Sequence, residues 1–564
     1  MPEMTGAQAM YEFLVRQGVE YIFGNPGTSE LPLMDVFAER NEIEYVLALH
    51  EDSALGIAAG YAEATGKPAV VNLHTNPGLA HALGNLYNAY RAGTPLIVTA
   101  GQQDTRSLID EPLLQADMVE MARQHTKWAW EVKCAAEIPR VLARAFTIAM
   151  TPPTAPVFIS LPVNFMEARA EFEFPEITKI GSTLQSDPER LNAAAKLLMD
   201  AKQPVIIAGD GVARAGAVPQ LVAFAELIGA AVHPEPLHSL LGFPTDHRLF
   251  AGPLSPAAHQ MHAQLQNADV ILAIGVYTLA PLVYTGARMI PDTSKLIQLD
   301  VNAHELGKNF FAEVAIQADL RSAIEDLSSS IKSMMTPAFS QLVWRRSTLI
   351  ADRITDGRAK LKEAAVPPKD GEWMPAAFVA KVMREVASDD TLLVDEAVTS
   401  TAYVRTLFEL SEPGAYLFCK GGSLGYGAPT AVGYKLGRKD RPVICAIGDG
   451  SLLYSPQALW TAARYKLGVV FVVFNNTSYA ILKGGLLALN GSSVERGIFK
   501  GMDITEPEID FVKMAESMGV AARRVVDASQ LQAALVWALT ESFHKQQPHL
   551  LDVMISRDAR SVLR

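Results

Sequence analysis

Short runs of β-branched and other apolar residues recur along the chain and alternate with longer segments of helical periodicity. The strand-like runs lie at residues 69–73, 95–100, 157–161, 205–208, 270–274, 296–299, 443–447 and 469–474. Near-continuous apolar strands separated by helices are typical of βαβ units, in which helices cover both faces of a parallel sheet. The pattern therefore predicts an α/β protein built from doubly wound parallel sheets.

Two stretches interrupt this alternation and mark candidate domain boundaries. Residues 171–187 are rich in Glu, Pro and Ser, and residues 334–373 hold a charged helical stretch followed by Pro367-Pro368. A chain of 564 residues is too long for one core, and about one domain per 100 to 200 residues suggests about three. We expect an N-terminal domain at 1–175, a middle domain at 188–335 and a C-terminal domain at 370–564.

A faint internal similarity links the first and third of these domains. Residues 56–71 (GIAAGYAEATGKPAVV) and 428–444 (APTAVGYKLGRKDRPVI) both place glycine and alanine on a helix, then a turn, then proline before a strand. Chance is one explanation, because a Gly-Tyr pair near a short helix end is common. The other is that two similar α/β domains flank a different middle domain.

The composition is that of an ordinary globular protein, with 49% hydrophobic and 20% charged residues. A net charge of −12 argues against binding nucleic acid or an anionic membrane through bulk electrostatics. The three cysteines, Cys134, Cys419 and Cys445, lack the paired spacing of a zinc site or a disulfide framework. With neither a signal-peptide pattern at the start nor an apolar run approaching ~18 residues, we expect a cytoplasmic protein.

Candidate chemistry gathers between Gly448 and Asn476. One apolar run leads into Gly448-Asp449-Gly450-Ser451, a helical run follows at 456–466, and the next apolar run ends in Asn475-Asn476. Asp449 and Asn476 would thus lie at the carboxyl ends of two strands, where ligands bind in open α/β sheets. Their oxygens suit Mg²⁺, and glycines at a helix start let backbone N–H groups approach phosphate. The segment predicts a magnesium and diphosphate site, with the backbone carbonyl of Ser478 as a third protein ligand.

A second GDG sequence occurs at residues 209–211. It also follows a strand-like run, but no Asn-Asn strand end comes after it at a similar spacing. A polar turn between strand and helix is the favoured interpretation. A nucleotide site there would need basic residues, and Arg214 is the only one in GDGVARAG.

The GDGS and NN motifs resemble those of thiamine-diphosphate-dependent decarboxylases, and most resemble the benzoylformate decarboxylases. The resemblance extends along nearly the whole chain through FGNPGTSELP, LALHED, NLHTNPG, PLIVTAGQQ, GGSLGYGAP, GDGS, ALWTAARY and NNTSY. It implies three domains, namely pyrimidine-binding, middle and diphosphate-binding, with thiamine diphosphate and Mg²⁺ as cofactors. That cofactor supplies a C2 carbanion that attacks a keto carbon and then accepts electrons, while the protein orients and deprotonates it.

The resemblance also assigns cofactor contacts. Glu51 matches the acid that exchanges a proton with the pyrimidine ring, Gly422 the residue whose carbonyl holds its amino group, and Leu424 the residue that bends the cofactor. Further contacts are assigned to Thr399, Gly448, Gly450, Ser451, Ser478, Tyr479, Ala480 and Ile481. Simpler interpretations stay open: Gly422 as a turn, Leu424 as a core residue and Thr399 as a helix cap.

Three further residues concern the substrate. His74 resembles the active-site histidine of the benzoylformate decarboxylases, which handles protons near neutrality. Thr28 matches a serine that binds the substrate carboxylate, although its hydroxyl could instead cap the following helix. His50 stands where the aromatic decarboxylases tend to carry glutamine, and we place it behind the residues that touch substrate.

The pocket departs from the family pattern in two places. Benzoylformate decarboxylases carry a second histidine after the strand at 270–274, and Leu282 stands at the matching position here. Ile481 and Leu482 are expected to line the pocket, with isoleucine narrowing it as in pyruvate decarboxylases. We expect an apolar cavity with His74 as its main titrating group, and we assign Lys483 no role.

The leading functional hypothesis is decarboxylation of an aromatic or aliphatic 2-keto acid, with carboligation to an acceptor aldehyde. The alternatives are an acetolactate-synthase-like or 2-hydroxyacyl-CoA-lyase-like carboligase, and an inactive regulatory homologue. Retention of Glu51, Asp449 and Asn476 speaks against an inactive protein. In the resembled family the cofactor spans two chains, so we expect a homodimer at least and a tetramer as the usual assembly.

Overall fold

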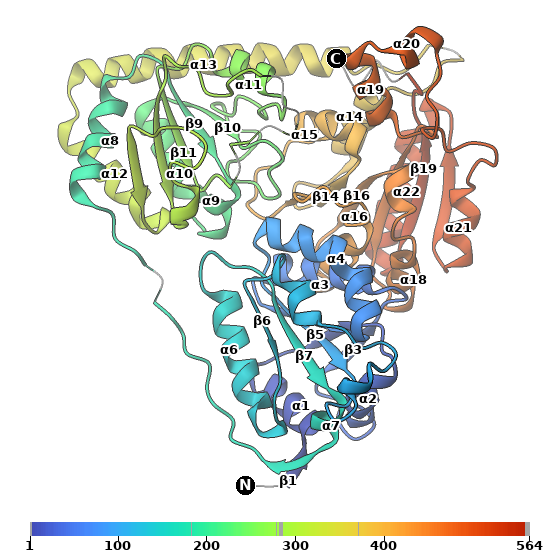
Figure 1. The fold of residues 1–564 in the computed structure, drawn as a ribbon. Helices are drawn as coiled ribbons and strands as arrows, with labels where there is room; N and C mark the ends of the chain where they lie inside the picture. Colours follow the sequence, from blue (N-terminus) through green and yellow to red (C-terminus); the bar gives the residue numbers. More distant parts are fainter. Residues whose placement is uncertain are drawn as a thin grey trace.

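The fold was obtained as a computed structural model in which residues 3–181, 183–277, 279–280, 282, 286–369 and 371–558 are described. The described chain forms three parallel sheets with helices packed around them, arranged as three lobes (Figure 1). The prediction of three doubly wound α/β domains is therefore confirmed. All eight predicted strand runs are strands, and each sheet lies within one of the predicted domain ranges.

The N-terminal domain contains a six-stranded parallel sheet of order β3-β2-β4-β5-β7-β6. Its strands are β2 (Tyr21–Gly24), β3 (Glu44–Leu47), β4 (Ala69–Leu73), β5 (Leu96–Gln102), β6 (Trp128–Glu131) and β7 (Val157–Pro162). Its helices are α1 (Gly6–Arg16), α2 (Leu31–Val36), α3 (Glu51–Thr65), α4 (Thr75–Ala92), α5 (Met118–Arg123), α6 (Ile138–Met150) and α7 (Val163–Glu167). The short strands β1 (Glu3–Thr5) and β8 (Arg169–Glu171) pair antiparallel outside this sheet.

The middle domain has a smaller sheet of order β10-β9-β11-β12-β13, also parallel throughout. Its strands are β9 (Pro204–Ala208), β10 (Ala231–Pro234), β11 (Val270–Ile274), β12 (Lys295–Asp300) and β13 (Val314–Gln317). Around it lie α8 (Pro188–Asp200), α9 (Asp210–Arg214), α10 (Val218–Ile228), α11 (Ala258–Leu265) and α12 (Leu320–Met334). The domain has hydrophobic clusters of its own.

The C-terminal domain repeats the strand order of the N-terminal domain. Its sheet runs β15-β14-β16-β17-β19-β18, formed by β14 (Leu392–Glu396), β15 (Tyr416–Phe418), β16 (Val443–Gly448), β17 (Val469–Asn475), β18 (Ala521–Val525) and β19 (His549–Met554). Its helices are α14 (Ala376–Val386), α15 (Thr401–Leu407), α16 (Gly427–Gly437), α17 (Asp449–Leu452), α18 (Gln457–Arg464), α19 (Ala480–Leu489), α20 (Ser492–Arg496), α21 (Phe511–Ser517) and α22 (Ala528–Lys545). In both sheets the second strand in sequence occupies one edge, so the internal similarity reflects two copies of one fold.

The two similar domains pack through the helices that carry this similarity, α3 and α16. A Cβ atom on Gly60 would lie 2.0 Å from the carbonyl oxygen of Thr430, and one on Gly433 would lie 1.7 Å from that of Ile57. The glycines of the two Gly-Tyr pairs thus let the helix backbones approach closely. One hydrophobic cluster runs continuously through both domains.

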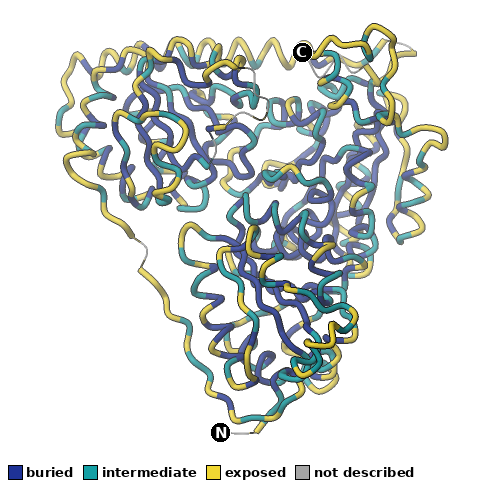
Figure 2. Tube along the Cα trace, viewed as in Figure 1, coloured by how far each residue is buried: buried dark blue, intermediate teal, exposed yellow. Residues whose placement is uncertain are grey.

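The two predicted boundary stretches behave differently. The described residues of the segment between β8 and α8 run along the outside of the molecule, and most of them are exposed (Figures 1 and 2). The charged stretch forms the long helix α13 (Pro337–Ala364), which extends from the middle domain toward the C-terminal domain. Arg346 on this helix is buried and donates to the carbonyl groups of Ala201 and Ile228. No helix among the described residues is long and apolar enough to cross a membrane.

Candidate functional site

The GDGS and NN segments meet at one edge of the C-terminal sheet. Strands β16 and β17 pair in parallel with Gly448 opposite Phe474, so both end at the same level. Asp449 begins α17 immediately after β16, and Asn476 follows β17. The predicted placement of Asp449 and Asn476 beside each other at strand ends is thus present in the fold.

Asp449 has one carboxylate oxygen to spare. Its Oδ1 accepts from the backbone N–H of Gly450 at 2.9 Å, whereas its Oδ2 is buried without a hydrogen-bond partner. Burial raises the pKa of Asp449 to about 6, against the opposing effect of the backbone N–H groups of Gly450, Thr477 and Ser478. A buried carboxylate oxygen without a donor is poorly stabilised, and a cation beside it would favour the ionised form. The residues therefore fit an oxygen-coordinated metal.

A tight turn places Ser478 next to Asn476. The side-chain Oδ1 of Asn476 accepts from the backbone N–H of Ser478 at 3.0 Å and from its hydroxyl group at 3.2 Å. Thr477 between them is left-handed, with φ of 54°. The ring of Tyr479 then packs on Gly450, where an added Cβ atom would lie 2.5 Å from a ring carbon. The GDGS and NN segments consequently form one compact unit.

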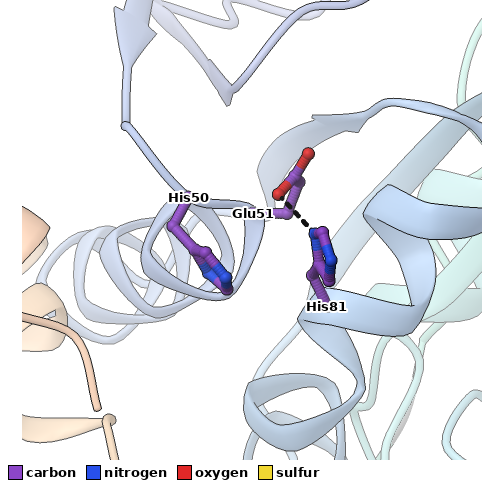
Figure 3. Close-up of side chains that lie close together, drawn as sticks. All are labelled: His50, Glu51 and His81. Atoms are coloured by element: carbon purple, nitrogen blue, oxygen red, sulfur yellow. Dashed lines mark hydrogen bonds and ion pairs between the residues drawn. The ribbon is translucent and has the colours of Figure 1, made fainter.

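In the N-terminal domain, Glu51 is the first residue of α3 and is buried. Its Oε2 lies 3.1 Å from Nδ1 of His81 on α4 (Figure 3). Its Oε1 lies 3.5 Å from Nδ2 of Asn25. His50 caps α3 by accepting from the backbone N–H of Asp52, and its ring stacks on that of His81 with centroids 5.1 Å apart. Partial burial lowers the pKa of His50. Oε1 of Glu51 is thus the less engaged of its two oxygens.

His74, at the end of β4, pairs with a buried carboxylate. Its Nδ1 lies 2.8 Å from Oε2 of Glu30 and 3.2 Å from the hydroxyl oxygen of Ser29. Glu30 is fixed by backbone N–H groups of Gly27 and Gly101, each at 3.0 Å, and by the Ser29 hydroxyl at 2.7 Å. The hydrogen bond to Glu30 raises the pKa of His74, with burial opposing it. Glu30 therefore fixes the ring orientation and favours the protonated imidazole.

Two glycines bring the N-terminal residues together. A Cβ atom on Gly78 would lie 3.3 Å from Cγ of Glu51 and 3.5 Å from Cβ of His74. The backbone of Gly78 therefore lies next to both side chains. A Cβ atom on Gly27 would lie 2.2 Å from the ring of His74. Glu51 and His74 thus occupy the same edge of the N-terminal sheet.

The remaining predicted contacts lie on turns and helix starts. Thr28 is exposed in the 3-10 turn η1 (Thr28–Glu30), whose cap is Gly27, while the cap position of α2 is Glu30. Thr399 lies inside the 3-10 turn η5 (Val398–Ser400), and Ser400 occupies the cap position of α15. The cap interpretation therefore holds for neither threonine. Gly422 is left-handed with φ of 80°, which requires glycine, and Leu424 is half-buried.

The predicted pocket residues Ile481, Leu482 and Leu282 are all exposed. Ile481 and Leu482, in the first turn of α19, are 40% and 51% exposed, and Leu282 is 69% exposed. Lys483 forms an ion pair with Asp503, in keeping with its lack of an assigned role. A cavity of about 390 Å³ lies at the opposite edge of the N-terminal sheet, lined by residues including Tyr21, Lys67 and Ala69. Since strands β2 and β4 begin there, that cavity is not the predicted substrate pocket.

Sequence reasoning missed Glu30, Ser29 and His81. Glu30 and Ser29 belong to the FGNPGTSELP motif, but nothing local indicates that they contact a histidine more than 40 residues away. A signal for His81 did exist. Residues 74, 78 and 81 follow the helical period, so a helix starting after His74 presents Gly78 and His81 on the face where His74 lies.

The fold and the site define a class of protein: an α/β enzyme in which one of two similar domains places Asp449 beside Asn476 at its strand ends and the other places Glu51 near His74. The chain matches three family descriptions of thiamine pyrophosphate enzymes: the N-terminal TPP binding domain at 4–122, the central domain at 191–327 and the C-terminal TPP binding domain at 397–553. The chain belongs to the thiamine-diphosphate-dependent enzymes.

Several relatives cover nearly the whole chain. A benzoylformate decarboxylase of Pseudomonas aeruginosa is 31% identical over 97% of this chain and 98% of its own. A probable acetolactate synthase large subunit of Methanocaldococcus jannaschii is 28% identical over 98% of this chain and 92% of its own. The structure of a thiamine-diphosphate-dependent 4-hydroxybenzoylformate decarboxylase from Rhodococcus jostii superimposes with a TM-score of 0.85, at 30% identity over 99% of this chain and 100% of its own.

Proposed function

We propose that the protein is a thiamine-diphosphate- and Mg²⁺-dependent decarboxylase of 2-keto acids, with carboligation to an aldehyde as a second outcome. When bound, thiamine diphosphate supplies the carbanion that attacks the keto carbon and accepts the electrons released with CO₂. The observation that carries the proposal is the shared edge of the N-terminal sheet on which Glu51 lies next to His74. One acid and one histidine there can serve different protons of the same reaction.

In the C-terminal domain, Asp449, Asn476 and the backbone carbonyl of Ser478 would hold Mg²⁺. The buried Oδ2 of Asp449, without a hydrogen-bond partner, supports this assignment. Gly448, Gly450 and Ser451 at the start of α17 would bind the diphosphate, since glycines let the backbone approach the phosphates and a helix start favours negative charge. Thr399, Tyr479, Ala480 and Ile481 would contact the rest of the cofactor.

Glu51 would exchange a proton with the pyrimidine ring. His81 engages its Oε2, and the long contact from Asn25 leaves Oε1 largely available. Gly422 would offer its carbonyl oxygen to the amino group of the ring, and Leu424 would press against the cofactor. The left-handed turn at Gly422 supports an exposed backbone contact of this kind.

His74 would handle the proton on the substrate side. Because its Nδ1 faces Glu30, its Nε2 is the ring atom that can hold or release a proton. The Thr28 hydroxyl in the neighbouring turn would bind the substrate carboxylate. Ile481, Leu482 and Leu282 would line the pocket, which favours an aliphatic or modest aromatic 2-keto acid.

Assembly is part of the same proposal. Glu51 and Asp449 lie in different domains of one chain, and we propose that each cofactor is bound between two chains of a homodimer, with a tetramer as the full assembly. Exposure of Ile481, Leu482 and Leu49 in the single chain supports a partner surface near the site. The described cysteines are all free, which suits a cytoplasmic location.

The test is incubation of the purified protein with thiamine diphosphate, Mg²⁺ and a panel of 2-keto acids, with and without an acceptor aldehyde. Release of CO₂ with an aldehyde supports the decarboxylase proposal. A 2-hydroxy ketone without net aldehyde favours the carboligase alternative, which the acetolactate synthase relatives support. Absence of CO₂ from every keto acid, in protein shown to bind the cofactor, would refute the proposal.

A further inference from the structure

Three charged side chains meet in the interior between the middle and C-terminal domains. Nζ of Lys420 lies 2.6 Å from Oδ2 of Asp210 and 2.6 Å from Oε1 of Glu235. The three side chains are at most 6% exposed. Removal of charges from water is costly unless each charge is paired and hydrogen-bonded, so this cluster fixes a specific geometry.

The two carboxylates are held firmly by the middle domain. Asp210 accepts hydrogen bonds from the backbone N–H groups of Ser239 and Leu240 and from the Ser239 hydroxyl. Glu235 accepts from the backbone N–H groups of Asp210 and Tyr277, both at 3.0 Å. Burial opposes ionisation of Asp210, but Lys420 and these donors hold its pKa at about 2, while burial raises the pKa of Glu235. The ammonium group of Lys420 therefore contacts two carboxylates whose positions are fixed by hydrogen bonds within the middle domain.

Lys420 lies two residues before Gly422 and four before Leu424, the residues that would contact the cofactor. In the segment 420–424, Asn88 of the N-terminal domain donates to the carbonyl oxygen of Ser423 at 2.8 Å and accepts from its backbone N–H at 3.2 Å. Between these fixed points, Gly422 is exposed and left-handed, with open space around its Cα. The segment is thus held by Lys420 before Gly422 and by Ser423 after it.

We propose that Asp210 and Glu235 are positioning residues that hold Lys420, and through it the 420–424 segment, in the shape that binds thiamine diphosphate. This inference rests on the proposed roles of Gly422 and Leu424. It gives the middle domain a part in cofactor binding without a ligand of its own. It also explains the GDG sequence at 209–211, whose aspartate serves a lysine of another domain and not a metal.

Helix α9, which begins at Asp210, also carries a residue that offers a matched control. Arg214 of α9 is half-buried and pairs at 2.7 Å with Glu63, whose side chain is 6% exposed, while its Nε donates to the carbonyl oxygen of Ala92. Both partners belong to the N-terminal domain and lie outside the 420–424 segment. Loss of this pair also removes an ion pair between domains, yet leaves Lys420 with both of its carboxylate partners.

The test compares Lys420→Met, the neutral triple variant Asp210→Asn/Glu235→Gln/Lys420→Met, and the control Arg214→Met/Glu63→Gln. The triple variant leaves no buried charge unpaired, so it carries the test if Lys420→Met fails to fold. For each protein, thiamine diphosphate affinity with Mg²⁺ is measured by quenching of tryptophan fluorescence. The urea midpoint of the cofactor-free protein is measured in parallel.

We expect the Lys420 variants to bind thiamine diphosphate about tenfold more weakly, equivalent to about 1.4 kcal/mol, and the control to retain wild-type affinity. A triple variant with wild-type affinity overturns the inference, as does an equal loss of affinity in the control. Cofactor binding is read without substrate. Wild-type protein that binds cofactor but decarboxylates nothing would therefore refute the proposed function alone.

Discussion

The Nδ1 atom of His74 lies 2.8 Å from Oε2 of Glu30, a carboxylate that is itself 3% exposed and held by two backbone N–H groups. The pair ties the end of β4 to the turn before α2. Because the hydrogen bond raises the pKa of His74, Glu30 sets both the orientation and the charge of the imidazole.

Glu30→Gln should lower the pKa of His74. The pKa of His74 is higher in the folded than in the unfolded protein, where it is about 6.5, so the His74–Glu30 pair stabilises the fold fully below this pH. This contribution is lost as the pH rises through the folded-state pKa of His74. In the variant, His74 should lose its proton at lower pH, and the limb of the rate profile governed by His74 should shift the same way. NMR titration of the His74 ring checks the first expectation. Glu39→Gln, on the exposed surface, is the control, and an unchanged His74 titration would contradict the assignment.

Glu51→Gln should lower turnover of every substrate by about 100-fold or more, the usual range for loss of a positioned proton donor. The amide keeps the shape of the side chain, and the residues proposed to bind the metal and the diphosphate lie in another domain. Binding of thiamine diphosphate should therefore be retained. Steady-state kinetics and a cofactor titration on the same preparation separate the two effects, with exposed Glu44→Gln as the control. Wild-type turnover in Glu51→Gln would remove Glu51 from the proton transfer.

Mg²⁺ affinity should fall as pH decreases through about 6. Burial raises the pKa of Asp449 to about 6, and the carboxyl group must be ionised to coordinate a cation. Below this pH, each pH unit should weaken binding by about tenfold, because one proton competes with the metal. Calorimetric titration of Mg²⁺ in the presence of thiamine diphosphate measures the slope. Asp449→Asn should bind weakly with no such slope; a flat profile in the wild-type protein would exclude Asp449 as a ligand.

Gly433→Ala should destabilise the fold by about 1–3 kcal/mol, the usual cost of inserting a methyl group into a packed site. The added Cβ atom would lie 1.7 Å from the carbonyl oxygen of Ile57, so α3 and α16 would have to separate. Gly485→Ala is the matched control, since it also lies within a helix and has nothing within 4 Å. Urea unfolding of the three proteins measures the difference. Equal stability of both variants would show that the helix contact is not tight.

Much of the fold followed from local patterns. The strand runs were recognisable because a parallel strand covered on both faces must be apolar along its length, as in Val443–Gly448 and Val469–Asn475. The meeting of Asp449 with Asn476 followed as well, since neighbouring parallel strands end at the same edge. The similarity between residues 56–71 and 428–444 indicated two related domains, but chance was an alternative explanation. The matching strand orders of the two sheets, and the close approach of α3 and α16 at Gly60 and Gly433, exclude it.

The sequence by itself determined the α/β class, the strand ends that carry Asp449 and Asn476, and the cofactor family. Each depends on residues close together in the chain or on a motif. Only the tertiary structure decided that Glu30 orients His74, that His81 contacts Glu51 and that Asp210 serves Lys420, 210 residues away. Such contacts depend on how helices and domains pack. The sequence around a charged residue in a turn does not indicate which distant residue it will contact once the chain has folded.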